Sequence, residues 1–396
     1  MEETTMKRAS KRLSGLIVGM ALAGVMTPAA HAAEEVKVGL MLPATGTYAR
    51  LGTAITNGFK LYVDENGGML GGASVSYATV DDESDPAKAT ENANKLVKRD
   101  GVDVLVGTVH SGVAMAMAKV ARGSKTLMIV PNAGADELTG PLCAPNIFRT
   151  SFTNWQPSYA MGPVLLKKGI KRVVTLTWKY SAGLQAIEGF KESFTAGGGE
   201  IVQELTLPFP NTEFQPYLTE IATLKPDAVF VFFAGGGAVK LAKDYAAAGL
   251  KDSIPLYGSG FLTDGTLAAM GGAGEGLLTT LHYADGLDNP KDKAFRASYE
   301  KAYGAAPDVY AVQGYDAAQL LAAGLAAVKG KVEDREGMIK AMAAARIDSP
   351  RGSFAMSPAH NPVQDIYLRE ARGDINPVVA VAAAALADPA RGCRMK

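Results

Sequence analysis

Short apolar runs alternate with longer segments of helical spacing along this chain. From Val36 onward, four apolar runs predict strands: KVGLMLP, SVSYATVDD, VDVLVG and TLMIVP. The segments between them predict helices at 51–66, 86–99 and 111–122. Continuous runs of this kind are typical of strands that are buried on both faces. The alternation therefore predicts right-handed crossovers and a parallel sheet covered by helices on both sides.

A second series of the same kind follows the segment NIFRTS. Its predicted strands are VVTLTW, GEIVQELTL, AVFVFF and PLYGSG, with predicted helices at 154–168, 181–196, 214–224 and 237–248. This predicts a second parallel sheet and hence a second lobe. One more strand, GLLTTLHY, leads to helices near 290–303, 309–329 and 334–345. No strands separate these late helices, so we expect them to cover the first sheet. PRGSFAMS and VQDIYLRE close the fold, and we expect the Ala-rich tail at 378–390 to be partly mobile.

The stretch from Gly107 to Ala135 carries the main candidate for ligand binding. Ser111 stands where an N-cap is expected, and the loop of Asn132, Ala133 and Gly134 follows the next strand. In a parallel α/β sheet, the carboxyl ends of adjacent strands and the helix N-termini after them face one crevice, which favours an anion. The pattern predicts a carboxylate pocket. The alternative is that Ser111 only caps its helix and that the loop is only a turn.

Residues 1–32 have the pattern of a secretory signal peptide. A basic segment ending at Arg12 precedes an apolar stretch at 13–26 and an A-x-A cleavage site at 30–32. The apolar stretch is too short to span a bilayer, which needs roughly 20 residues. We therefore expect an exported protein that begins near Ala33 and works in a periplasm.

Composition and motifs argue against several classes of function. Forty basic residues balance forty acidic ones, so no net charge favours nucleic acid as a partner. The phosphate-binding loop, the zinc-protease motif, the nucleophile elbow and the dinucleotide glycine pattern are all absent from the sequence. His110, His282 and His360 lie at separations that suggest no metal site. We expect no catalytic residues, no cofactor and no metal.

Cys143 and Cys393 are the only cysteines. Their separation matches neither a zinc ligand set nor a redox C-x-x-C pair. Both lie in proline-containing segments, GPLCAPN and DPARGCRM, that resemble a surface loop and a tail. In an oxidising compartment we expect them to form a disulfide. The alternative is two free thiols whose α-carbons lie too far apart.

Six segments carry a resemblance to a known family: KVGLMLPATGTYARLGTAITNGFKLYVDENGG, DPAKATENANKLV, GVDVLVG before Ser111, PNAGADELTG, NIFRTSFTN and GYDAAQLL. Together they resemble the periplasmic leucine/isoleucine/valine-binding protein family, the type I solute-binding components of ABC importers. The resemblance covers the whole mature chain. It implies an α/β periplasmic binding protein type I fold, with two Rossmann-like lobes of parallel sheets, a three-segment hinge and a ligand cleft between the lobes. We place lobe 1 at 33–152 plus 284–346, lobe 2 at 153–283 plus 347–385, and a C-terminal tail at 386–396. The implied partner is an ABC permease of the inner membrane, and we expect a monomer.

The departures from the family pattern indicate the class of ligand. In amino-acid-binding members, a serine at the position of Ser111 and the loop matching 132–134 bind the ligand's carboxylate and amine, and an acid after the strand matching PLYGSG neutralises the ammonium group. Here Gly134 stands where a threonine is usual, and Ser259-Gly260-Phe261 take the place of the acid. A buried ammonium group without a carboxylate costs several kcal/mol, so amino acids are not expected. The resemblance is closest to the branch for aromatic carboxylates such as benzoates, hydroxybenzoates and hydroxycinnamates.

By analogy with this branch, we expect the cleft to be lined by polar loop residues and aromatic rings. The candidate ligand-binding residues are Tyr48, His110, Ser111, Asn132, Ala133, Gly134, Tyr180, Gly260 and Phe261. The sequence leaves open whether Trp155, Phe233 and Tyr283 line the cleft or belong to the core. Two alternative functions also stay open: a branched-chain amino-acid receptor that takes its acid from Asp264 or Glu275, and a ligand-sensing regulator.

Overall fold

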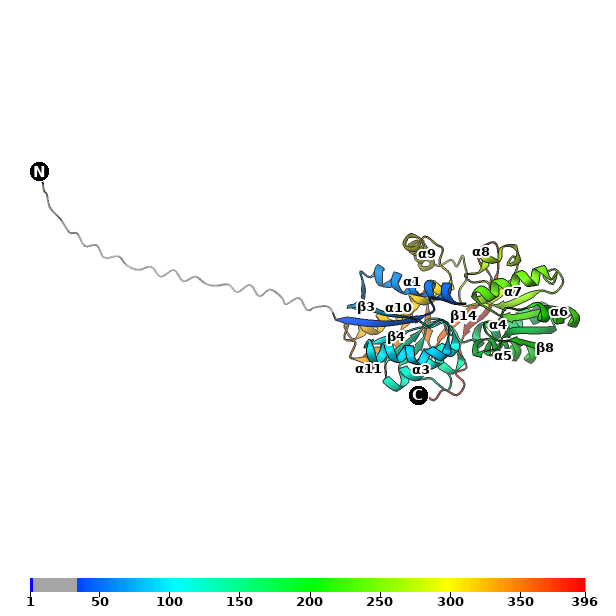
Figure 1. Cartoon of the computed structure of the whole chain (residues 1–396), viewed down its shortest axis with the longest axis horizontal. Coiled ribbons are helices and arrows are strands. Elements are labelled where there is room, and N and C mark those ends of the chain that lie inside the picture. Colours follow the sequence, from blue (N-terminus) through cyan, green and yellow to red (C-terminus); the bar gives the residue numbers. More distant parts are fainter. Residues whose placement is uncertain (3–33, 396) are drawn as a thin grey trace. The chain divides into compact units, whose positions relative to one another are not determined.

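The computed structural model describes residues 1–2 and 34–395 (Figure 1). The signal peptide predicted at 1–32 falls almost entirely outside these residues. Residues Ala33–Lys396 form one compact unit that contains two sheets. Every strand and helix that we predicted is present in it, with shifts of a few residues at the ends.

The first sheet has the strand order β2-β3-β1-β4-β5-β6. All neighbouring strands are parallel except β2 and β3. Its strands are β1 (Glu35–Leu42), β2 (Met69–Leu70), β3 (Ala73–Asp81), β4 (Val104–Val106), β5 (Leu127–Val130) and β6 (Ile147–Arg149). The helices between them are α1 (Ala49–Glu65), α2 (Pro86–Asn94) and α3 (Ser111–Ser124). The first series is therefore a mostly parallel sheet, as the hydrophobic pattern predicts.

Three late helices return to the first sheet: α9 (Pro290–Tyr303), α10 (Val309–Ala327) and α11 (Arg335–Ala344). Leu320 and Leu325 of α10 and Met338 of α11 pack into the same buried cluster as Val36 of β1, which confirms the expected covering for these two helices. Phe295 of α9 packs instead into the cluster that contains residues of α1 and of the second sheet. Helix α10 also runs close along α1. A Cβ at Gly58 would lie 1.9 Å from the carbonyl oxygen of Ala311, so this approach requires glycine.

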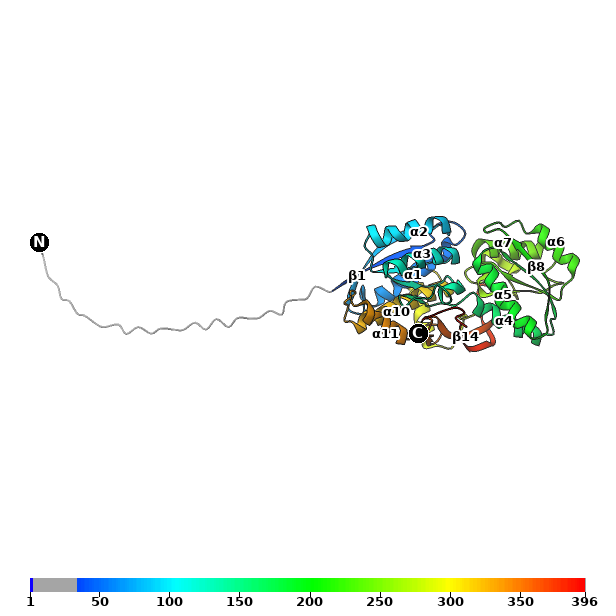
Figure 2. The ribbon, with the colours of Figure 1, turned by 90° about the horizontal axis from the view of Figure 1, so that it is seen from below.

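The second sheet has the order β12-β13-β14-β11-β10-β9-β7-β8, and β15 pairs with β14. Its parallel strands are β7 (Arg172–Trp178), β8 (Glu200–Leu207), β9 (Ala228–Phe232), β10 (Leu256–Ser259) and β11 (Leu278–Leu281). Its antiparallel strands are β12 (Arg346–Ile347), β13 (Phe354–Met356), β14 (Pro362–Glu370) and β15 (Val378–Leu386). The helices of this half of the chain are α4 (Trp155–Lys167), α5 (Ser181–Ala196), α6 (Gln215–Leu224) and α7 (Gly235–Ala247) (Figure 2), and the short α8 (Leu267–Met270) (Figure 1).

The expectation of a partly mobile tail at 378–390 is wrong for residues 378–386. These residues form β15, which extends the second sheet through antiparallel pairing with β14. Alanine has a low strand propensity, and VVAVAAAAL has no alternation of apolar and polar positions, so the local sequence does not predict a strand. Backbone pairing with β14 provides the order that the side chains do not.

The chain passes three times between the two sheets: after β6, after β11 and after α11. Buried Arg351, in the loop between β12 and β13 just after the third passage, donates hydrogen bonds to the carbonyl oxygens of Thr150 and Ser151 on the first. It also pairs with Asp316 of α10 at 3.0 Å. The three-segment hinge is present, while the lobe boundaries given above stay a prediction.

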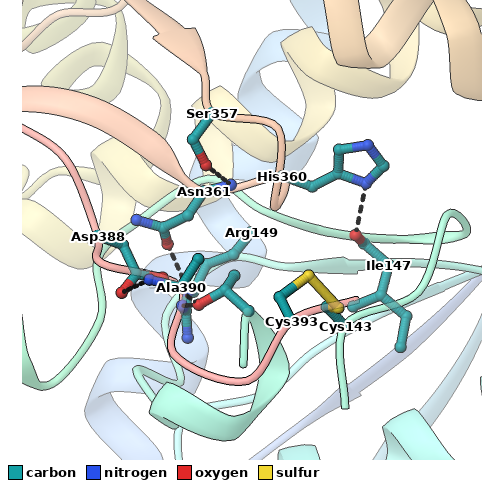
Figure 3. Close-up of a disulfide and its surroundings, with 10 residues drawn as sticks. Cys143, Ile147, Arg149, Ser357, His360, Asn361, Asp388, Ala390 and Cys393 are labelled. Carbon is teal, nitrogen blue, oxygen red and sulfur yellow. Dashed lines mark hydrogen bonds between the residues drawn. A yellow bond between two sulfur atoms is a disulfide. The ribbon is translucent and has the colours of Figure 1, made fainter. Parts of the chain in front are cut away.

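Cys143 and Cys393 form the predicted disulfide, with their α-carbons 5.6 Å apart (Figure 3). The bond ties the residues after β15 to the loop between β5 and β6. The hydroxyl of Thr139 donates to Asp388, and Arg391 pairs with Glu192 of α5 at 2.7 Å. The tail therefore leaves the second sheet and is fixed to the first, which makes it a fourth connection between the two halves.

Candidate functional site

A cavity lies between the two sheets at the carboxyl ends of their parallel strands. The space between its walls amounts to about 290 Å³, part of which is open to solvent. Loops after β1, β4, β5 and β6 supply one wall, and loops after β7, β9 and β10 supply the other, together with the start of α10. The lining residues are Tyr48, Leu51, Val109, Ser111, Asn132, Gly134, Phe152, Asn154, Tyr180, Ala182, Phe232, Ala234, Phe261 and Tyr310. The position is the one in which open α/β sheets bind ligands.

Six of the nine candidate residues line this cavity: Tyr48, Ser111, Asn132, Gly134, Tyr180 and Phe261. Ala133 lies just behind the wall, and its N–H donates to the carbonyl oxygen of Thr108. Gly260 is packed against Arg369, whose Nη2 donates to its carbonyl oxygen at 3.2 Å. Ala133 and Gly260 are therefore next to the cavity in the sequence but do not line it, whereas their chain neighbours Asn132, Gly134 and Phe261 do.

His110 is the N-cap of α3, and the prediction that Ser111 caps this helix is wrong. The imidazole Nδ1 of His110 accepts the N–H of Gly112 at 3.0 Å, and the ring stacks on Tyr180 with centroids 4.7 Å apart. Burial lowers the pKa of His110 to about 4. The ring is therefore neutral near pH 7, and it caps the helix without cancelling its dipole.

Because His110 caps the helix, the hydroxyl of Ser111 is available to the cavity. Ser111 is the first helical residue, and its Oγ accepts a hydrogen bond from Nδ2 of Asn154 at 3.3 Å. A hydroxyl that accepts in this way still has a proton to donate. Of the amides in the first helical turn, which have no acceptor further along the helix, that of Gly112 is already bonded to His110. The hydroxyl of Ser111 can therefore donate a hydrogen bond to an anion at this helix N-terminus.

Aromatic rings form the opposite walls. Phe152 and Phe261 lie 4.6 Å apart between centroids, Phe232 and Phe261 6.1 Å, and Phe261 and Tyr310 6.3 Å. The hydroxyls of Tyr48 and Tyr180 are hydrogen-bonded at 2.8 Å and join loops of the two halves. Two of these ring pairs are tilted and one is edge-to-face, and an aromatic surface of this kind favours a planar ring as ligand.

Gly134 makes room for one of these walls. A Cβ at this position would lie 2.5 Å from a ring carbon of Phe152 and 2.4 Å from Oδ1 of Asn154. A threonine here could not coexist with Phe152 and Asn154 as they stand. The glycine that departs from the family pattern thus places an aromatic ring and an amide where the usual side chain would be.

None of the cavity-lining residues that the structure describes has a charged side chain. Asp264, one of the two alternative acids, is buried against Arg369 at 2.6 Å instead. Glu275 accepts the N–H of Gly373 and does not line the cavity. Neither acid is placed to neutralise an ammonium group in this cavity.

The three aromatic residues left open by the sequence belong elsewhere. Phe233 packs edge-to-face on Trp178 in the core. The hydroxyl of Tyr283 donates to Asp292 at 2.8 Å. Trp155 lies below the tail, where its indole N–H donates to Glu192 at 2.9 Å.

Eight lining residues were not among the candidates: Leu51, Val109, Phe152, Asn154, Ala182, Phe232, Ala234 and Tyr310. Phe152 and Asn154 lie in the NIFRTSFTN segment directly after β6, so the rule that strand ends face the cleft could have found them. Tyr310 lies on a helix far along the chain, and nothing in its local sequence indicates the site.

Within residues 1–2 and 34–395, no group of three histidine, cysteine, aspartate or glutamate side chains is arranged to hold a metal ion. In the same part of the chain, no helix has the length and apolar character required to cross a membrane.

A family model described as "Periplasmic binding protein" matches residues 35–374. The chain belongs to this periplasmic binding protein family. Among curated proteins, it is 32% identical to Leu/Ile/Val-binding protein homolog 6 of Brucella melitensis over 361 residues, which cover 89% of this chain and 92% of the relative. The resemblance inferred from the six segments is confirmed.

Solved structures of periplasmic binding proteins agree with this assignment. A solute-binding protein of an ABC transporter from R. palustris, in complex with benzoate, is 57% identical with a TM-score of 0.89, covering 91% of this chain and 99% of that one. A second, from Rhodopseudomonas palustris BisB5 in complex with 3,4-dihydroxybenzoic acid, is 37% identical with a TM-score of 0.85, covering 90% and 99%. This periplasmic binding protein is thus a solute-binding component of an ABC transporter, a non-enzymatic class, as the sequence predicts.

Proposed function

We propose that this protein binds a small aromatic carboxylate of the benzoate, hydroxybenzoate or hydroxycinnamate type in the cavity between its two sheets. It delivers the ligand to an ABC permease of the inner membrane. It acts in the periplasm as a monomer, after export by the signal peptide at 1–32.

The observation that carries the proposal is a cavity with aromatic walls, hydrogen-bond donors and no charged side chain. An α-amino acid would bury an ammonium group there without a counter-charge, at a cost of several kcal/mol. In an aromatic carboxylate, only the carboxylate group needs hydrogen-bond donors. The ligand's ring can displace water and pack against the rings of Phe152, Phe232 and Phe261. Each aromatic contact contributes about 0.5–1.5 kcal/mol beyond area burial.

We assign the carboxylate to the N-terminus of α3. The hydroxyl of Ser111 donates to one oxygen, and Asn132 and Gly134, from the loop after the neighbouring strand, line the cavity with it. Hydrogen bonds to an ionised group are roughly twice as strong as neutral ones. The dipole of α3 adds a favourable interaction, since its cap is a neutral imidazole.

The relatives support the same class of ligand. Three solved relatives, 57%, 37% and 31% identical to this chain, are complexes with benzoate, 3,4-dihydroxybenzoic acid and p-hydroxybenzoic acid. The curated relative from Brucella melitensis is named a Leu/Ile/Val-binding protein homolog. For this chain we place branched-chain amino acids second, because neither Asp264 nor Glu275 faces the cavity.

A thermal-shift panel on the mature protein tests the proposal. At 100 times its dissociation constant, a ligand adds about 2.7 kcal/mol of stability. With about 2.1 cal/mol/K per residue over roughly 360 residues, the melting temperature rises by about 3.5 °C. We expect this shift with benzoate or 4-hydroxybenzoate and none with leucine or valine. A shift with leucine alone would reverse the proposal in favour of the amino-acid receptor.

A further inference from the structure

The hydroxyl of Tyr310 differs from those of the other cavity tyrosines in its hydrogen bonding. Tyr310 is fully buried at the start of α10 and lines the cavity, and its hydroxyl has no hydrogen-bond partner among the described residues. The hydroxyls of Tyr48 and Tyr180, in contrast, bond to each other at 2.8 Å. Buried polar groups in folded proteins almost always have a partner. A ligand in the cavity is the partner that this hydroxyl lacks.

The surroundings of Tyr310 disfavour an anion. Asp308 caps α10 and accepts the N–H groups of Tyr310 and Ala311 at 3.0 and 3.1 Å. Its Oδ2 and the Tyr310 ring both lie close to Gly265, since a Cβ there would be 2.9 Å from that oxygen and 3.7 Å from the ring. Burial raises the pKa of Tyr310 well above its usual value, and the carboxyls of Asp264 and Asp308 add to this, while the guanidinium of Arg369, which pairs with Asp264, partly opposes it. The hydroxyl therefore stays protonated, close to negative charge.

Three other helices that begin at the cavity, α3, α5 and α7, have no such carboxylate at their caps. Helix α3 is capped by the neutral ring of His110, and α5 and α7 have no side-chain cap. Their N-termini favour negative charge, whereas Asp308 already occupies the N-terminus of α10. The cavity is thus electrostatically asymmetric. A ligand carboxylate is favoured at α3, and a neutral polar group is favoured beside Tyr310.

We propose that Tyr310 determines specificity by hydrogen-bonding a hydroxyl on the ligand's ring, while the carboxylate is held at the N-terminus of α3. This rests on the proposed function and deepens it from aromatic carboxylates in general to hydroxylated ones. A phenol both donates and accepts, so it satisfies the hydroxyl of Tyr310 without bringing charge to Asp308. The ring of Phe261, 6.3 Å from that of Tyr310, forms the adjoining wall.

Titration calorimetry with benzoate, 3-hydroxybenzoate, 4-hydroxybenzoate and 4-methylbenzoate tests this proposal. The methyl group is similar in size to the hydroxyl but cannot form a hydrogen bond. For the wild-type protein, we expect at least one hydroxybenzoate to bind about tenfold more tightly than benzoate. The 4-methyl analogue has no such advantage.

In Tyr310→Phe, the ratio of the dissociation constants for benzoate and the preferred hydroxybenzoate falls about tenfold. The matched control is Tyr245→Phe, which removes a buried hydroxyl bonded to the carbonyl oxygen of Ile254 outside the cavity and leaves the ratio unchanged.

The outcomes separate this proposal from the broader one. Benzoates that bind without preference for the hydroxyl, or a ratio that is the same in Tyr310→Phe, overturn the role of Tyr310 and leave the aromatic ligand class in place. If no aromatic carboxylate binds, both proposals are wrong. The wild-type comparison of hydroxyl with methyl decides the matter even if the variant does not fold.

Discussion

Replacing both cysteines with serine should destabilise the protein measurably, because the disulfide closes a very large loop. Cys143 and Cys393 are separated by 250 residues; Cys143 lies between two strands of the first sheet, and Cys393 lies in the tail that follows β15 of the second. On the chain-entropy model, closing a loop of this length restrains the unfolded chain by about 5.5 kcal/mol at 25 °C. With about 2.1 cal/mol/K per residue over roughly 360 residues, the melting temperature should fall by about 7 °C.

The assay compares wild type with Cys143→Ser/Cys393→Ser by differential scanning calorimetry, with and without dithiothreitol. The reductant should lower the melting temperature of wild type to that of the variant and leave the variant unchanged. The variant's tail should also become sensitive to trypsin at Arg391, since non-covalent contacts such as those with Thr139, Glu192 and the Trp155 ring then hold it without the disulfide. A variant that melts at the wild-type temperature, with its tail still protected, would refute the idea that the bond restrains this loop.

Three further changes test the candidate site. Ser111→Ala should weaken aromatic carboxylate binding, measured by calorimetry, by about 1–3 kcal/mol. The melting temperature should change little, because His110 rather than Ser111 caps α3. Unchanged affinity would exclude the role given to this hydroxyl. Gly134→Thr should lose binding through the clash with Phe152 and Asn154, and a variant that binds benzoate normally would contradict this. The folded-state pKa of His110, about 4, is below its unfolded value near 6.5, so the stability it contributes is complete above pH 6.5 and is lost as pH falls towards 4. His110→Asn keeps a capping oxygen and should reduce the slope of unfolding free energy between pH 6.5 and 4, measured by urea denaturation; an identical slope would show that another group causes it.

The hydrophobic pattern was sufficient to predict both sheets and the helices that cover them, because buried parallel strands and amphipathic helices have distinct periods. It failed at β15, whose order depends on pairing with β14 rather than on its own alanine-rich residues. At the site, the strand-end rule found Ser111, Asn132 and Gly134. The same rule could not show that His110 rather than Ser111 caps α3. Which of two adjacent polar residues is the N-cap depends on the backbone geometry at the start of the helix, which the sequence does not specify.

Residues that come from distant parts of the chain were the hardest to predict. Tyr310 reaches the cavity because α10 packs along α1, a contact between segments some 250 residues apart. Conversely, Phe233 and Tyr283 follow strands as Phe261 does, but they point into the core. The direction of a side chain after a strand end depends on the local turn, which composition and spacing do not specify.

A crystal structure of the mature protein with 4-hydroxybenzoate tests the central claim most directly. We expect the ring to pack against the cluster of Phe152, Phe232 and Phe261, with a carboxylate oxygen about 2.7–3.2 Å from Oγ of Ser111 and the ring hydroxyl turned towards Tyr310. A carboxylate that lies against Tyr310 and Asp308, or a ligand bound outside this cavity, would contradict it.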